Sequence, residues 1–264
     1  MIDPSHWYLL PVGLGVASVA MAVGISGSNF WLPLFLVALS LPPRIAFWMA
    51  LATMVFGSGS GVVRNLRAKT IDGRLAGHLL LLAGPAAMLG SFVATLVPAA
   101  PLLVLFALIA ALSGVRALRP VAPVEPNGAQ RATAERMGPL RIAAGVGGLL
   151  QGLVATGCGT LLLPALLEHR RAAAPRLVGT SVLVVFVSAI AAALARLDGS
   201  MLAALAARQE TIVSMLAFAA PGVVLGGQLG PRIAQRLPRR TLRRCFGVLL
   251  LLVAVLVVVR AFGA

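Results

Sequence analysis

Two short stretches of small and polar residues interrupt long apolar runs, and they hold the residues best suited to bind a ligand. The first is GISGSNFWLP at residues 24–33, and the second is ATGCGTLLLP at residues 155–164. Glycine lets the backbone approach a ligand closely, and hydroxyl or amide groups can hydrogen-bond to it. The candidate binding residues are Ser26, Gly27, Ser28 and Asn29 in the first stretch and Gly157, Cys158, Gly159 and Thr160 in the second.

Each stretch leads into an apolar segment, at residues 29–40 and 160–167, that is too short to cross a hydrocarbon layer of about 30 Å. We therefore expect each stretch to be a break in a membrane helix, followed by a half-helix. Pro33 and Pro164 support this, because proline is accepted near the start of a helix. The free N–H groups and partial positive charge of a helix start attract anions. The alternative is that the small residues only pack helices together.

Acidic residues are missing where a cation pathway would need them. Proton pumps and cation carriers commonly hold Asp or Glu near the bilayer centre. No Asp or Glu lies near the middle of an apolar run here, so an anion held by helix ends and neutral donors fits better. Weaker pore-lining candidates are polar residues elsewhere in the apolar runs, namely Ser58, Gln151, Thr180, Ser181 and Gln228.

The composition places these stretches in a membrane protein. Of the 264 residues, 59% are hydrophobic and 11% are charged, which leaves too few polar residues to cover a soluble fold of this size. The 28 glycines and 17 prolines favour packed and interrupted helices over a β-barrel. We predict an all-α polytopic membrane protein. The longer apolar runs lie near residues 7–24, 44–63, 76–97, 101–118, 139–156, 176–195, 210–230 and 245–262.

The charge distribution and the cysteines indicate which binding partners the chain is expected to have. The net charge is +15, but the basic residues separate apolar runs instead of forming a patch, so they indicate membrane orientation and not nucleic-acid binding. Cys158 and Cys245 lack metal-type spacing, and we predict neither a metal nor another cofactor. The start MIDPSHW lacks the basic residues of a cleavable signal peptide, so the first apolar run is expected to remain.

The two halves look like copies of one unit. The breaks lie 131 residues apart, and PAAMLG at residues 85–90 is matched by PGVVLG at residues 221–226. We predict a first membrane repeat at residues 1–119, a Pro-rich cytoplasmic linker at 120–138 and a second membrane repeat at 139–264. Chance similarity between glycine-rich apolar segments is the alternative.

Equivalent connections in the two halves carry opposite charge bias. The connections at residues 64–74, 116–141, 170–176 and 232–244 hold 18 of the 22 basic residues. Cytoplasmic loops are enriched in Lys and Arg. If each broken segment re-enters and three crossings follow, these connections are all cytoplasmic, the repeats are inverted and both termini are periplasmic. Four basic residues then fall outside: Arg44, Arg196, Arg208 and Arg260.

The paired breaks, VGTS at residues 178–181 and PGVVLGGQLGPRIAQRLPRRTLRR at residues 221–244 resemble the TauE/SafE sulfite exporter family, also called the toluene-sulfonate uptake permease superfamily. The resemblance covers nearly the whole chain. It implies a bacterial inner-membrane protein of two homologous halves that moves sulfite, sulfonates or related organosulfur anions. Ser26, Ser28 and Cys158 depart from the usual triple-glycine break, so the resemblance does not identify the anion.

Three functions remain open on this basis. The leading hypothesis is a carrier or passive facilitator for a small oxyanion, with the two halves moving alternately around a midplane site. A cation or amino-acid carrier would keep the same architecture. An intramembrane hydrolase is the third, because Ser26 lies in a G-x-S-G pattern and His78 could serve as its base. Gly157 stands where the first half has Ser26, which favours backbone shape over a hydroxyl nucleophile.

Overall fold

The computed structural model describes residues 3–23, 28–118, 137–168, 174–236 and 239–262. Nearly all of these residues are helical, and no strand occurs among them. The elements are η1 (Pro4–His6), α1 (Leu9–Val23), α2 (Ser28–Pro33), the π-helical turn η2 (Leu34–Ala38), α3 (Pro43–Arg67), α4 (Gly73–Leu96), α5 (Ala99–Leu118), α6 (Met137–Val154), α7 (Cys158–Glu168), α8 (Ala174–Ala195), α9 (Gly199–Ala206), α10 (Gln209–Arg236) and α11 (Arg239–Phe262).

Six of the described helices are long and apolar enough to cross a bilayer, namely α3, α4, α5, α6, α8 and α10. Large apolar side chains remain exposed on them; Leu81 of α4, for example, is 73% exposed and Phe92 is 58% exposed. An apolar surface of this extent needs a cover, and the hydrocarbon of a membrane supplies one. The prediction of an all-α polytopic membrane protein is confirmed.

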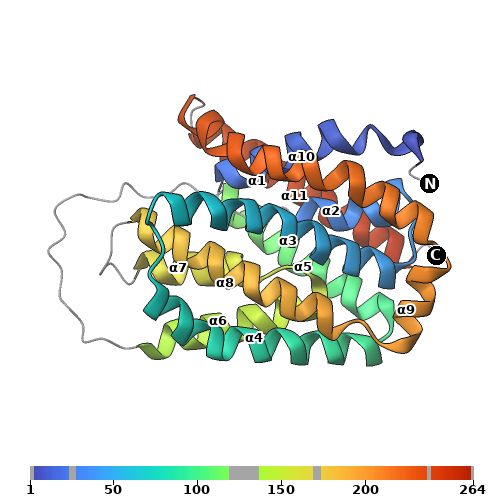
Figure 1. The fold of residues 1–264 in the computed structure, drawn as a ribbon, viewed down its shortest axis with the longest axis horizontal. Helices are drawn as coiled ribbons and strands as arrows, with labels where there is room; N and C mark the ends of the chain where they lie inside the picture. The colour runs from blue at the N-terminus through green and yellow to red at the C-terminus, as the bar shows by residue number, and fades with distance from the viewer. Residues whose placement is uncertain (1–2, 24–27, 119–136, 169–173, 237–238, 263–264) are drawn as a thin grey trace, which may run out of the picture.

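The helices lie along the long axis of the molecule, which therefore has two ends (Figure 1). At one end, which we call the terminal end, the backbone N–H of Asp3 donates to Ser214 Oγ, and Arg44 pairs with Asp198. At the other, the linker end, α5 ends, α6 begins, and the backbone N–H of Asp72 donates to Thr180 Oγ1. Basic residues near helix ends at the linker end include Arg64, Arg67, Arg74, Arg116, Arg141 and Arg176.

The two broken helices form hairpins that open toward opposite ends of the molecule. In the second half, α6 starts at the linker end, and α7 runs back toward that end, where α8 begins (Figure 1). In the first half, η1 and α1 start at the terminal end, and α2 and η2 lead back to the start of α3 at the same end (Figure 1). The two hairpins therefore approach the interior from opposite sides.

The packing of the helices repeats when the two halves are exchanged. Helix α1 packs on α10 and α6 on α4, while α3 packs on α10 and α8 on α4. Helices α5 and α11 contact each other, as do α3 and α8. If α1 is matched with α6, α3 with α8, α4 with α10 and α5 with α11, each of these contacts becomes another contact of the same set.

Two glycines of the repeated sequence at residues 85–90 and 221–226 make two of these contacts close. A Cβ atom on Gly90 would lie 2.2 Å from the carbonyl oxygen of Leu149 in α6, and one on Gly226 would lie 2.5 Å from that of Leu14 in α1. Any side chain would therefore push the helices apart. The repeated sequence has the same packing role in both halves.

The structure corrects two boundaries. The stretch between residues 195 and 210, expected to be a connection, contains α9, whose N-cap Asp198 accepts a hydrogen bond of 2.6 Å from the backbone N–H of Met201. A helix of eight residues gives too short a periodic pattern to be recognised among apolar runs. The connection expected at residues 232–244 is also shorter, since α10 reaches Arg236 and α11 begins at Arg239, because arginine is a good helix former.

Candidate functional site

The second break is a turn of three residues between α6 and α7. Helix α6 ends at Val154, the next residue Ala155 has a φ of 57°, and Gly157 has a φ of 124°. The second of these angles is accessible to glycine and rarely to other residues. Helix α7 then begins at Cys158, and the Thr160 hydroxyl donates a hydrogen bond of 2.8 Å to the carbonyl of Gly157. Thr160 therefore closes the first turn of the half-helix.

The first break is described on both of its sides. Helix α1 ends at Val23 and α2 begins at Ser28. Ser26 and Gly27, which we predicted to bind a ligand, lie outside the described residues, as does the side chain of Ser28. Asn29, in the first turn of α2, is fully buried.

The two breaks meet through their side chains. The hydroxyl of Thr156, in the middle of the second break, donates a hydrogen bond of 2.5 Å to Asn29 Oδ1, and both residues are fully buried. Asn29 Nδ2 is buried too and has no hydrogen-bond partner. A buried N–H group without a partner costs about 1–3 kcal/mol. The junction of the breaks therefore holds an unused hydrogen-bond donor.

The chemistry of this junction is that of a donor site. The amide oxygen of Asn29 is occupied by Thr156, so the free part of the side chain can only donate. The first N–H groups of α7 have no acceptor within their own helix, because a helix leaves its first turn unpaired. Among the described residues, no group of His, Cys, Asp and Glu could hold a metal ion. A ligand at this junction must supply acceptor atoms.

The remaining residues of the second stretch shape the hairpin. Cys158 is fully buried at the start of α7. Gly159 is half-buried, and a Cβ atom there would lie 3.4 Å from Val185 of α8, an ordinary contact. Gly157 is more constrained, since its Cβ would lie 2.7 Å from that of Leu150. The structure thus brings Asn29, Gly157, Cys158, Gly159 and Thr160 to one region around the α6–α7 turn.

Gln151, a weaker candidate, ties α6 to α8. Its Nε2 donates a hydrogen bond of 3.1 Å to the carbonyl of Val185, and its Oε1 accepts one of 3.3 Å from Ser188. Both polar ends of this buried side chain are therefore used within the protein. Gln151 supports the wall beside the second break.

The other weaker candidates also bond to the protein or are simply buried. Ser58 donates to the carbonyl of Met54 one turn earlier, at 2.6 Å, and Gln228 Nε2 donates to the carbonyl and the hydroxyl of Ser60. Thr180 donates to the carbonyl of Arg176 and accepts from the backbone N–H of Asp72. Ser181 is buried on the next position of α8. Gln228 and Thr180 thus join neighbouring elements, Ser58 bonds within its own helix, and none of these hydrogen bonds reaches Asn29 or Thr156.

Two residues that lie in this region of the structure were not among the predicted site residues. Thr156 lies within the second stretch, directly before the predicted set, which begins at Gly157. Arg196 was expected in a connection outside the membrane and is instead only 5% exposed, with Nη2 donating to the carbonyls of Gly152 and Leu153 at 2.6 Å each. The position of Arg196 directly after an apolar run gave no signal of this burial.

His78, the base of the hydrolase alternative, is exposed near the linker end of α4. Its Nδ1 is hydrogen-bonded to the carbonyl of Arg74 at 2.8 Å. Ser26, its expected partner, lies outside the described residues.

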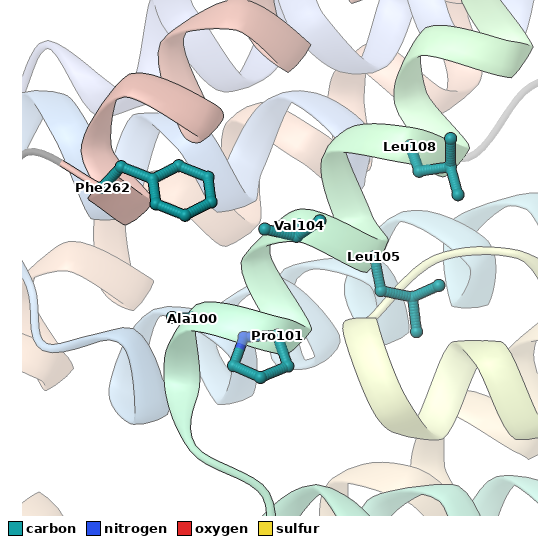
Figure 2. Close-up of a pocket in the computed structure, with 6 residues that line it drawn as sticks. All are labelled: Ala100, Pro101, Val104, Leu105, Leu108 and Phe262. Atoms are coloured by element: carbon teal, nitrogen blue, oxygen red, sulfur yellow. The ribbon is translucent and has the colours of Figure 1, made fainter.

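A groove of about 430 Å³ lies between the start of α5 and the end of α11 (Figure 2). Figure 2 shows Phe262 of α11 near Val104 of α5, with no polar side chain among the residues drawn. A groove with this lining offers nothing to hold a charged ligand. Its six lining residues are Ala100, Pro101, Val104, Leu105, Leu108 and Phe262.

A helical bundle with six candidate spans, an apolar exterior and two interrupted helices that meet inside is the architecture of a multi-pass membrane transporter. Comparison with known proteins agrees. The chain belongs to the TauE/SafE sulfite exporter family, whose model matches residues 9–257. The chain is also 28% identical over 239 residues to the "Probable membrane transporter protein YjnA" of Bacillus subtilis (strain 168), which covers 86% of this chain and 91% of that protein. No solved structure matches. The predicted resemblance is confirmed, and with it a membrane transporter role.

Proposed function

We propose that this chain carries small oxyanions, namely sulfite, sulfonates or related organosulfur anions, across the bacterial inner membrane. The single observation that carries the proposal is the junction of the two breaks, where Thr156 bonds to Asn29 and leaves Asn29 Nδ2 buried without a partner. An anion with several acceptor oxygens is the ligand that such donors favour. The matched family is described as sulfite exporters, which supports this class of anion.

The charges of the described residues support an anion over a cation. The buried polar and charged residues include serines, threonines, amides and Arg196, and no Asp or Glu is among them. A cation in a buried site needs carboxylates or a ring of carbonyl oxygens to replace its hydration. The junction instead presents an amide donor and the start of a helix.

We further propose that the two halves are inverted repeats and that alternating access arises from their relative movement. Hairpins that open at opposite ends, and helix contacts that repeat on exchange of the halves, support this arrangement. In such folds the site lies where the repeats meet, so each movement can expose it to one side of the membrane. The Asn29–Thr156 bond joins one half to the other and is placed to change during that movement.

The test is uptake into proteoliposomes of radiolabelled sulfite and a short alkanesulfonate, with alanine and ammonium for comparison. We expect sulfite or sulfonate flux from the wild-type protein. Asn29→Asp should lower this flux by about tenfold or more, because it replaces the free donor with an acceptor that repels the anion. Thr156→Val should also lower it, because Asn29 then loses its partner.

Thr53→Val is the matched control for Thr156→Val. Thr53 is also fully buried, but it donates only to the carbonyls of Met49 and Ala50 in its own helix. Its variant should transport like the wild type. A wild-type protein that moves alanine or ammonium and neither anion would overturn the proposal.

A further inference from the structure

Arg196 is a buried cation beside the second break. Its guanidinium lies 5.2 Å from the ring centre of Phe47, and its Nη2 donates to the carbonyls of Gly152 and Leu153. Those carbonyls belong to the last turn of α6, which leads directly into Thr156. The Nε atom of Arg196 is buried and has no hydrogen-bond partner.

No carboxylate described in the structure neutralises Arg196. The nearby acid, Asp198, is paired with Arg44 at 2.9 Å. The Ser200 hydroxyl and the backbone N–H of Met201 hold the pKa of Asp198 below its ordinary value, so this carboxylate is ionised at neutral pH. Arg44 and Asp198 cancel each other, and Arg196 supplies the remaining positive charge at the buried end of α6.

Arg64 is the equivalent residue in the first half. The first turns of α3 and α8 contain Pro43-Arg44 and Pro175-Arg176, which are 132 residues apart, and Arg64 and Arg196 are separated by the same 132 residues. An Asp-Gly pair follows each arginine at a different spacing, and its Asp caps the next helix, α4 in the first half and α9 in the second: Asp72 accepts from Leu75 N and Asp198 from Met201 N. Arg64 Nη1, like Arg196 Nε, is buried without a hydrogen-bond partner.

The surroundings of the two arginines correspond as well. One turn before Arg196, the carbonyl of Ala192 accepts a hydrogen bond from Ser91 of α4. One turn before Arg64, Ser60 donates to the carbonyl of Val224 in α10, the helix that matches α4. Because α3 and α8 run in opposite directions, Arg64 lies at the linker end and Arg196 at the terminal end (Figure 1).

We propose that Arg196 and Arg64 receive the anion, each from its own end of the molecule, before it reaches the junction of the breaks. This inference rests on the proposed function. Arginine keeps its charge when buried, and an unpaired guanidinium in a low-dielectric interior attracts an oxyanion with hydrogen bonds of defined geometry. The free N–H groups of the two arginines are the donors that the anion would meet.

The experiment measures KM and maximal rate for radiolabelled sulfite in right-side-out and in inside-out bacterial membrane vesicles. Arg196→Gln should raise KM about tenfold in the vesicles that offer sulfite to the terminal end and less than about twofold in the others. Arg64→Gln should raise KM about tenfold in the vesicles that offer sulfite to the linker end and less than about twofold in the others. The maximal rate should change less than KM in both variants, because the junction itself is intact.

Matched controls test whether KM depends on Arg64 and Arg196 in particular or on surface charge in general. Arg67→Gln removes an exposed charge one turn along α3 at the linker end, and Arg208→Gln removes one at the terminal end. Both should leave KM unchanged in both vesicle types. Arg196→Lys keeps a charged donor and should restore part of the affinity, again only in the vesicles that offer sulfite to the terminal end.

The outcomes are distinguishable. If Arg196→Gln does not accumulate in the membrane, Arg64→Gln decides, because Arg64 is less buried than Arg196 and its Nη1 has no hydrogen bond to lose. Equal KM changes in both vesicle types, or wild-type KM values in both variants, would overturn this inference and leave the proposed function standing. An absence of sulfite and sulfonate flux in the wild type would overturn the proposed function, and this inference with it.

Discussion

At the scale of single residues, the second break depends on two unusual backbone angles. Ala155 follows the last residue of α6 with a φ of 57°, and Gly157 has a φ of 124°. Non-glycine residues adopt the second angle at a cost of about 1–3 kcal/mol. The turn places Thr156 between these residues, with its hydroxyl on Asn29. Backbone strain in this turn therefore positions the Thr156 hydroxyl, whose bond to Asn29 joins the breaks.

We predict that Gly157→Ala destabilises the protein by about 1–3 kcal/mol, because alanine disfavours this φ and its Cβ would lie 2.7 Å from Leu150 Cβ. Gly145→Ala is the matched control on α6, where a new Cβ meets nothing within 4 Å and helix propensity favours alanine. Thermal unfolding in detergent measures both. Equal midpoints for the two variants would contradict the role assigned to Gly157.

At the scale of helices, close packing at two equivalent contacts supports the broken segments. Helix α4 holds α6 at Gly90, and α10 holds α1 at Gly226. The supported helices are the ones that end at the breaks. An interrupted helix loses backbone hydrogen bonds, and tight packing against a continuous neighbour helps to keep it in place.

Gly90→Val and Gly226→Val should therefore destabilise the protein to a similar extent, about 1–3 kcal/mol each, because both overfill a backbone contact. Gly84→Val, on α4 at a position with no atom within 4 Å of a new Cβ, should leave the unfolding midpoint near that of the wild type. The same detergent unfolding assay applies. A large effect at one glycine and none at the other would argue against equivalent roles in the two halves.

At the scale of the whole molecule, charge is divided between the two ends. The described basic residues in helix ends gather at the linker end, whereas Arg44, Arg196, Arg208 and Arg260 lie toward the terminal end. Cytoplasmic loops attract Lys and Arg, so this division favours a cytoplasmic linker end and periplasmic termini. The proposed orientation rests on this asymmetry alone, because the fold would pack equally well either way up.

Two matched cysteine variants test the orientation. Ala207→Cys and Ala68→Cys each replace an exposed alanine at a helix C-cap, the first at the terminal end and the second at the linker end. Both are made with Cys245→Ser, because Cys245 is exposed, while the buried Cys158 is kept. In intact cells a membrane-impermeant maleimide should label Ala207→Cys at once and Ala68→Cys only after permeabilisation. The reverse labelling pattern would show that the linker end is periplasmic and the terminal end cytoplasmic.

The residues named in the two stretches could be found from sequence because glycine, small polar residues and a following proline mark a helix break by local chemistry. Asn29 and Gly157 were identified in this way. Their partner Thr156 and the buried Arg196 could not be, because each acquires its role from a residue on another helix. The helix α9 was missed because its eight residues carry too little pattern.

The sequence by itself determined that this protein is a bundle of membrane helices with two breaks and an uneven distribution of basic residues, since each of these follows from runs of side chains along the chain. Only the tertiary structure decided that the breaks meet, that Thr156 donates a hydrogen bond to the amide oxygen of Asn29, and that the amide nitrogen of Asn29 has no partner. Those facts depend on which helices pack together across 127 residues of chain, a distance over which local periodicity carries no information.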